Sequence, residues 1–226
     1  MRSSNERAST DDLLDLSIGE FTALVAKAFR GAGYPWGLTE EAAFASGWLA
    51  EAGIDAAQVV LDLLEANEDA HVDGPALDSH IIDVGKWHWG SATHTQCPVR
   101  VGAAILDLGR CATLTVDGLI APLLVAPFLS TLIVDVGAGG YVVEWHGGRC
   151  EVGASGLQLS GTDASGPTTA TITSNPKLDL IDCVRKDRAR LDAKTMNELT
   201  AFAHRTYAPA TKASRLRGAG AAEADD

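Results

Sequence analysis

The sequence has few of the residues that build redox or metal centres. Its four cysteines are widely separated and form no Cys-x-x-Cys pair, since they stand at Cys97, Cys111, Cys150 and Cys183. This spacing argues against a zinc knuckle and against a thioredoxin-type redox motif. We therefore expect reduced cysteines that act mostly as small apolar packing residues, and a protein with no metal and no cofactor.

Long apolar runs are also absent. The longest, from Leu119 to Val136, contains two prolines and Asp135, which would be costly in an isolated transmembrane helix. Residues 1–12 are polar and lack the apolar core of a secretory signal. The sequence therefore predicts a cytoplasmic protein with no membrane partner.

Positive charge is scarce. The chain has 30 acidic and 18 basic residues, a net charge of -12, and such a chain repels phosphate backbones unless its bases gather on one surface. More than half of the bases do lie from Lys177 onward, but this segment also carries acids and lacks interleaved aromatic pairs for base stacking. We expect no nucleic-acid partner.

Phosphate-binding loops are missing as well. Gly137-Ala138-Gly139-Gly140 begins like a dinucleotide-binding turn, but Val142 stands where the last glycine is required and a strand is expected to follow. No Gly-x-x-x-x-Gly-Lys-Ser/Thr run occurs, which argues against kinase and ATPase activities. Gly153-Ala154-Ser155-Gly156 lacks the second glycine of a nucleophile elbow, because that position is Leu157.

The composition is that of an ordinary globular protein. Of 226 residues, 46% are hydrophobic and 21% are charged. A chain of this length can bury roughly 70% of its unfolded surface, so a self-sufficient core is expected.

Capping and apolar periodicity predict three helices in the N-terminal third. Ser17-Ile18-Gly19-Glu20 matches a capping box, and apolar residues then recur at intervals of three and four up to Gly31. Thr39 is expected to cap a second helix, and Asp55 a third that closes near Asn67.

Short apolar runs broken by glycine and proline follow from residue 68. They predict strands at Val99–Leu108, Ala112–Val116, Tyr141–His146 and Thr168–Thr173. Pro127–Val136 fits a buried helix or strand, and the helix is favoured because proline is tolerated in a first turn. Asp192 is expected to cap a last helix that ends before Pro209. The prediction is an α+β fold, with a helical N-terminal subdomain at 13–67 and a mainly antiparallel sheet with a C-terminal helix at 68–226, in one integrated domain.

A cluster around Trp87-His88-Trp89, with His94 and Cys97 nearby, suggests metal binding or a Cys–His nucleophile pair. No two of these residues have the i, i+4 spacing of helical zinc ligands. Alternation along a strand would put both tryptophans on one face and His88 on the other, so core packing with a surface histidine is the simpler interpretation. The spacing of His94 and Cys97 neither ensures nor forbids a hydrogen bond between them.

Two segments are candidate binding elements. Tyr34-Pro35-Trp36-Gly37 joins the first two predicted helices, and its tryptophan either fills the helical core or lines a pocket. Arg30 and Glu41 flank it and could pair with each other or contact a substrate. After the last predicted helix, hydroxyls, guanidiniums and glycines gather, the chief ones being Tyr207, Ser214, Arg215, Gly218 and Gly220.

The same residues carry a family resemblance. The chain resembles uncharacterised bacterial proteins of similar length, classed as domain of unknown function 3726. The matching residues are Leu16-Ser17, 30–38, Glu40 to Ala42 and Trp48-Leu49 at the front, and 205–207, Pro209, Ser214-Arg215 and 218–220 at the back. The family has no assigned activity, so the resemblance implies where a site lies and not what it does. A fainter similarity is to the helical N-terminal region of malate and L-lactate dehydrogenases that lack a Rossmann domain, whose active-site histidine-glycine stretch has no equivalent here.

We therefore predict a pocket for a small carboxylate-bearing metabolite where the Trp36 segment meets residues 207–220. In this hypothesis Arg215 holds the anion, Ser214 orients it, Tyr207 is acid, base or donor, and Glu40 or Glu41 transfers protons. Arg30, Trp36, Gly218 and Gly220 would complete the binding site. The alternative is a non-catalytic accessory subunit that docks on a larger metabolic enzyme through its C-terminal segment, and homo-oligomerisation is a further possibility.

Overall fold

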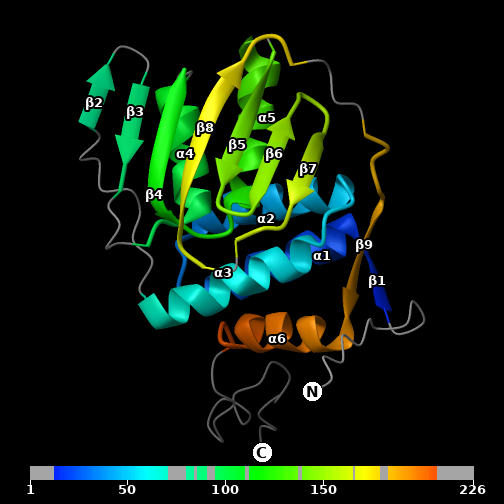
Figure 1. Ribbon diagram of the computed structural model, residues 1–226. Helices are drawn as coiled ribbons and strands as arrows, with labels where there is room; N and C mark the ends of the chain where they lie inside the picture. Colours follow the sequence, from blue (N-terminus) through cyan, green and yellow to red (C-terminus); the bar gives the residue numbers. More distant parts are fainter. Residues whose placement is uncertain are drawn as a thin grey trace, which may run out of the picture.

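The structure of this protein is a computed structural model with an α+β fold, as predicted (Figure 1). It describes residues 13–70, 80–83, 86–90, 95–109, 112–136, 139–164, 166–178 and 183–207. In these ranges no helix is both long and apolar enough to cross a membrane.

A seven-stranded sheet forms the upper layer in Figure 1. Its order is β2 (His80–Asp83), β3 (Lys86–Trp89), β4 (Thr113–Leu119), β8 (Thr168–Asn175), β5 (Gly140–Trp145), β6 (Gly148–Val152) and β7 (Leu157–Gly161). Only the β3–β4 pair is parallel among these strands, so the expected mainly antiparallel sheet is confirmed.

Helices form two groups around this sheet. α4 (Pro98–Leu108) and α5 (Ala126–Val136), the latter preceded by the short 3₁₀ helix η2 (Pro122–Val125), lie behind one sheet face (Figure 1). Below them lie α1 (Ile18–Gly31), α2 (Trp36–Glu51), α3 (Ala56–Ala70) and α6 (Ala193–His204). The buried hydrophobic residues of both groups and of the sheet form one continuous core.

The two ends of the described chain are joined. β1 (Leu13–Ser17) pairs antiparallel with β9 (Arg188–Asp192), and α6 continues directly from β9 along α1. The predicted caps hold these elements: Ser17 and Glu20 form the capping box of α1, and Asp192 accepts a hydrogen bond from the N–H of Thr195 at 2.8 Å. Because the pairing is antiparallel, α1 starts at one end of this small sheet, beside Arg188, and α6 starts at the other, beside Leu13.

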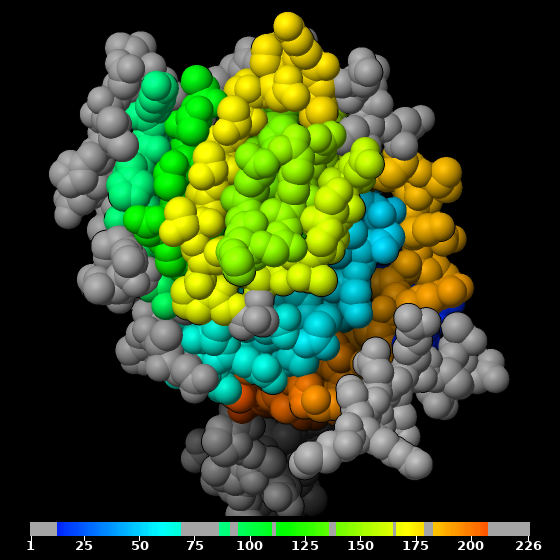
Figure 2. All heavy atoms as spheres, in the orientation of Figure 1, coloured from blue at the N-terminus to red at the C-terminus, as the bar shows by residue number. Residues whose placement is uncertain are grey.

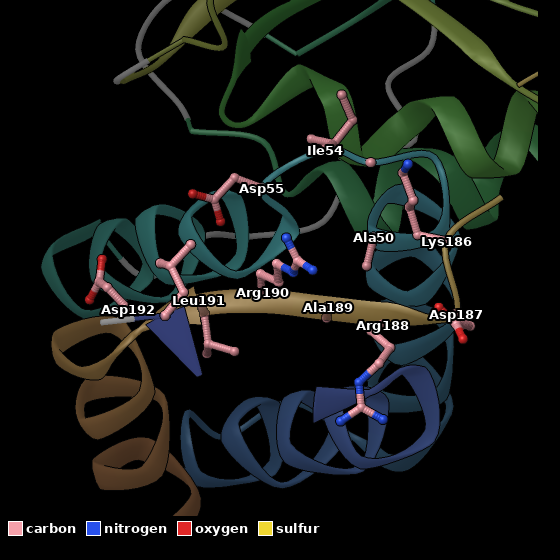
Figure 3. A pocket seen from close by; sticks show the side chains of 12 residues that line it. Ala50, Ile54, Asp55, Lys186, Asp187, Arg188, Ala189, Arg190, Leu191 and Asp192 are labelled. Atoms are coloured by element: carbon pink, nitrogen blue, oxygen red, sulfur yellow. The ribbon is translucent and has the colours of Figure 1, made fainter. Parts of the chain in front are cut away.

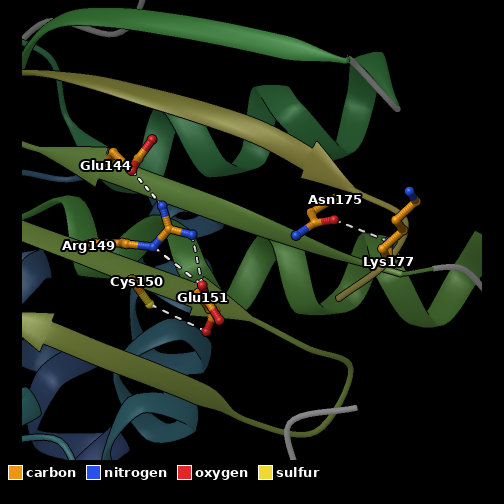
Figure 4. A network of polar contacts seen from close by, with 6 residues as sticks. All are labelled: Glu144, Arg149, Cys150, Glu151, Asn175 and Lys177. Atoms are coloured by element: carbon orange, nitrogen blue, oxygen red, sulfur yellow. Dashed lines mark hydrogen bonds and ion pairs between the residues drawn. The ribbon is translucent and has the colours of Figure 1, made fainter. Parts of the chain in front are cut away.

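The opposite face of the large sheet is open and polar. Figure 2 shows strands β4 to β7, green to yellow, without a helix in front of them. Threonines face each other across its centre, at Thr113 with Thr173 and Thr115 with Thr171. On β5 and β6, Arg149 binds Glu144 at 2.5 Å and Glu151 at 2.8 Å (Figure 4). Arg149 is therefore saturated by neighbouring carboxylates and offers no free cation.

Two local predictions were wrong. Val99–Leu108 is not a strand, because it belongs to α4, whose first residue is Pro98 and whose buried residues include Val101, Gly102 and Ile105 at helical spacing. Thr39 is not a cap: α2 already begins at Trp36, and the Thr39 hydroxyl donates to the Pro35 carbonyl inside the first turn. The segment expected as a helix at Pro127–Val136 is α5.

Candidate functional site

A basic hollow lies where the end of α1, the start of α2 and the end of the described chain come together. It has a volume of about 350 Å³ and is lined by Ala26, Lys27, Arg30, Trp36 and Thr206. We call these five residues the basin. Arg30 and Trp36 were predicted as binding residues, whereas Lys27 and Thr206 were missed. The signal for Lys27 was its place three residues before Arg30, which puts both side chains on one helical face.

Arg30 is held in a fixed position at the basin. Its Nη1 donates to the carbonyl of Tyr34 at 2.8 Å, and its guanidinium carbon lies 4.6 Å from the ring centroid of Trp36. A guanidinium over an indole face is a favourable cation–π arrangement. Arg30 forms no ion pair with Glu41 or with another carboxylate of the described residues, so the expected salt bridge is absent there.

Trp36 is the first residue of α2 and not part of a loop. Its side chain is 67% exposed, so it does not fill the helical core. The residue before it, Pro35, provides no side-chain cap for the helix, and open space surrounds Gly37. The first amides of α2 therefore lack a side-chain acceptor, and such helix starts attract anions.

The C-terminal side of the basin is set by close helix packing. A Cβ on Gly31 would lie 1.7 Å from the carbonyl oxygen of Phe202, so only glycine lets α1 approach α6 this closely. Beyond α6, Arg205 pairs with Glu68 of α3 and lies over the Phe202 ring. These contacts bring Thr206 to the basin.

The predicted catalytic residues Tyr207, Glu40 and Glu41 are not among the residues that line the basin. Tyr207 is 61% exposed and its ring centroid is 5.4 Å from that of His204. Glu40 is exposed and follows Trp36 by four residues on α2. Glu41 is half-buried, and burial, Asp107 and Glu40 raise its pKa. Ser214, Arg215, Gly218 and Gly220 fall outside the described residues.

Cys97 is an inert packing residue in this fold. It is fully buried before α4, and its Sγ is 3.7 Å from the hydroxyl of buried Tyr34. Burial raises the pKa of Cys97 and, as the largest cause, that of Tyr34, so both groups stay neutral near pH 7. His94, the proposed partner, lies outside the described residues.

His88 lies on the opposite side of β3 from the tryptophans, as strand alternation predicts. Trp87 and Trp89 stack with centroids 6.2 Å apart, while His88 Nε2 lies 2.8 Å from Asp117 Oδ2. Thr169 donates to the other oxygen of Asp117 at 2.8 Å. Within the part of the chain that the structure describes, no three His, Cys, Asp or Glu side chains are grouped to hold a metal.

Comparisons with known proteins name no activity for the chain. No curated protein matches it. A crystal structure of malate dehydrogenase from Entamoeba histolytica aligns over 70% of this chain with 10% identity and a TM-score of 0.45. The chain spans about half of that protein, since the alignment covers 48% of it.

A family model described as "Protein of unknown function (DUF3726)" matches residues 16–80. The matched stretch contains α1, α2 and α3, and with them Arg30, Trp36, Glu40 and Glu41. The C-terminal block of the expected resemblance lies beyond it. Over residues 16–80 the chain resembles this family of proteins of unknown function.

Proposed function

We propose that the protein binds a small carboxylate-bearing metabolite in the basin. The observation that carries this proposal is the preset guanidinium of Arg30, which lies over Trp36 without a carboxylate partner among the described residues. A guanidinium with free N–H groups is well suited to bind a carboxylate. Lys27 adds a second cation on the same helical face.

The surroundings of the basin favour an anionic ligand over a neutral one. No acidic residue among those that the structure describes lines the basin, and the uncapped start of α2 contributes the positive end of a helix dipole. The indole of Trp36 supplies an exposed apolar wall for the body of the ligand. Tyr207, Glu40 and Glu41 are outside the lining, so binding is proposed and no reaction is assigned.

The proposal is tested by titrating the full chain with mono- and dicarboxylates that carry no amino group, followed by tryptophan fluorescence and calorimetry. A bound carboxylate should change the emission of wild-type protein, and most of this change should vanish in Trp36→Phe. Arg30→Gln should weaken binding about 10- to 100-fold, because a charge-assisted hydrogen bond contributes roughly 1.5–3 kcal/mol.

A matched control separates the basin from general charge effects. Arg149→Gln makes the same substitution on the open sheet face, where the guanidinium is bound by two glutamates, and it should leave binding unchanged. The proposal fails if no carboxylate binds, or if Arg149→Gln weakens binding as much as Arg30→Gln.

The exposed aromatic groups at this end also favour a second function. Trp36 and Tyr207 are 67% and 61% exposed, and large exposed aromatics are typical of protein contact sites. In this alternative, the protein is an accessory subunit that docks on a larger metabolic enzyme. A second chain should then co-purify in fixed stoichiometry with wild-type protein and be lost with Trp36→Asp, while carboxylates leave the emission unchanged.

A further inference from the structure

A second and larger cavity lies at the other end of α2. It has a volume of about 410 Å³ and is formed between the turn that joins α2 to α3 and the segment Lys186–Asp192 (Figure 3). The backbone N–H of Lys186 donates to the carbonyl of Glu51 at 2.7 Å, which ties this segment to the end of α2. This volume falls in the range of small-molecule sites, about 300–1,000 Å³.

Two cations of this cavity form no ion pair with a described residue, and two of the acids near them are bound by neighbouring arginines instead. Asp15 stands opposite Arg190 in the strand pairing, yet its carboxylate binds Nε of Arg188 at 2.9 Å. Glu51 likewise pairs with Arg185 instead of Lys186. Neither Arg190 nor Lys186 has an ion-pair partner in the described ranges of the chain.

The geometry shows where these charges lie. In Figure 3, Arg188 points toward α1, whereas Arg190 lies below the turn that carries Asp55. The side chain of Lys186 runs along the same turn, since its Cε would be 3.8 Å from a Cβ on Gly53. Both unpaired cations thus belong to the wall of the cavity.

The other end of the cavity is acidic. Figure 3 shows Asp192 and Asp55 on one side, Lys186 and Asp187 on the other, and Arg190 between them. The carboxylate of Asp55 accepts the N–H of Gln58 at 3.2 Å and forms no ion pair with a described residue. Burial raises the pKa of Asp55, and the charged groups acting on it, Asp192 and Asp62, raise it further. A cation beside this carboxylate would relieve both effects.

We propose that this cavity binds an amino acid, with the ligand carboxylate at Arg190 and Lys186 and the ligand ammonium at Asp55. The cations Arg190 and Lys186 and the carboxylate of Asp55 line the same cavity without forming ion pairs with each other. A zwitterionic ligand can pair with the cations and with the carboxylate at once. Between them, Ala50, Ile54 and Leu191 line the cavity and provide contact for an aliphatic side chain. The site is separate from the basin and does not depend on its proposed ligand.

The experiment is a thermal-shift screen of the full chain with the twenty standard amino acids, followed by calorimetry on the best ligand. For an aliphatic hit such as L-leucine, the comparison compounds are 4-methylpentanoate, which lacks the ammonium, and 3-methylbutylamine, which lacks the carboxylate. We expect the amino acid to bind at least about tenfold more tightly than either, because each analogue leaves one charged group of the site unpaired.

Variants assign the two ends of the ligand. Arg190→Gln should weaken amino-acid binding about tenfold or more, and Asp55→Asn, which keeps a good helix cap, should weaken the amino acid but not 4-methylpentanoate. Lys194→Gln, an exposed cation on α6 outside the cavity, should leave amino-acid binding unchanged.

The proposal is overturned if none of the twenty amino acids binds, or if 4-methylpentanoate binds as tightly as L-leucine to Arg30→Gln protein, in which the basin has lost its guanidinium. It is also overturned if Lys194→Gln weakens binding as much as Arg190→Gln. Loss of amino-acid binding in Arg30→Gln would move the ligand to the basin and contradict this assignment. Failure of the basin to bind simple carboxylates would leave the result at this cavity unaffected.

Discussion

Asp163 is a carboxyl group that we expect to make the free energy of unfolding depend on pH. It follows β7, its Oδ1 accepts the N–H of Ala164 at 3.0 Å, and the N–H of Leu123 in η2 also donates to it. Burial and then Asp62 raise its pKa from 3.8 to about 6 despite these hydrogen bonds. A carboxyl with a raised pKa in the folded state binds protons more tightly there than in the unfolded chain.

We therefore predict that Asp163 makes the protein less stable as pH rises from about 4 to about 6. The whole loss is at most about 3 kcal/mol, from roughly 1.4 kcal/mol per pKa unit, and less for a half-buried group. Asp163→Asn keeps an acceptor oxygen for the N–H of Ala164 without the charge. Urea unfolding should find the variant about 1–2 kcal/mol more stable at pH 7.5 and no more stable at pH 4.

Exposed Asp135 provides the control for this prediction. Asp135→Asn should stay within about 0.5 kcal/mol of wild type at both pH values, as surface substitutions generally do. A difference between Asp163→Asn and wild type that is the same at pH 4 and pH 7.5 would contradict the assignment.

Some residues of the two candidate sites could be predicted from the sequence and others could not. Trp36 and Arg30 were predictable as a pair, because a large aromatic and a base next to glycines at a helix end are unusual. Their direct contact and the absence of the Arg30–Glu41 salt bridge were not, since α2 begins four residues earlier than the Thr39 cap implied. The sequence did not indicate Asp55, Lys186 and Arg190 as binding residues. Which of these charges remains without an ion-pair partner depends on the pairing of β1 with β9 and on which arginine binds each nearby acid.

At the scale of elements, the contact of α1 with α6 depends on one glycine. Gly31→Ala would place a Cβ 1.7 Å from the backbone oxygen of Phe202, so the helices must separate. Overpacking of this kind costs about 1–3 kcal/mol, which outweighs the gain of about 1 kcal/mol from better helix propensity. Chemical unfolding followed by circular dichroism should show this loss.

Gly19→Ala is the matched control on the same helix. Nothing lies within 4 Å of a Cβ there, so alanine should be neutral or stabilising by up to about 1 kcal/mol. Equal destabilisation by the two substitutions would mean that helix packing at Gly31 does not matter.

Elements with local signals were predictable and those that depend on distant partners were not. The capping box of α1 and the caps Asp55 and Asp192 gave the helix starts correctly. α4 was mistaken for a strand because a short, mainly apolar stretch of eleven residues fits both periods. β1 and β9 were missed, since each is short and exists only through pairing with a segment from the other end of the chain.

At the scale of the whole molecule, the helical layer shares its packing surfaces with the rest of the chain. α1 lies along α6, β1 pairs with β9, and α2 touches both α4 and α5. Residues 13–67 therefore contribute buried apolar residues to the same core as elements from 68–226. We propose that the two regions fold as one cooperative unit, as a shared core requires.

One variant in each layer tests this unit. Gly31→Ala disturbs the helical layer, and Gly102→Ala disturbs the helices behind the sheet, because its Cβ would lie 2.1 Å from the buried ring of Phe128. If folding is cooperative, each variant lowers the single midpoint of denaturation, and tryptophan fluorescence and far-UV circular dichroism move together. The calorimetric and van 't Hoff enthalpies should also agree for wild type. Two transitions, with Gly31→Ala shifting only one of them, would instead show that residues 13–67 unfold independently. Ligand binding at the basin and at the second cavity would then have to be measured in a molecule whose two regions move relative to each other.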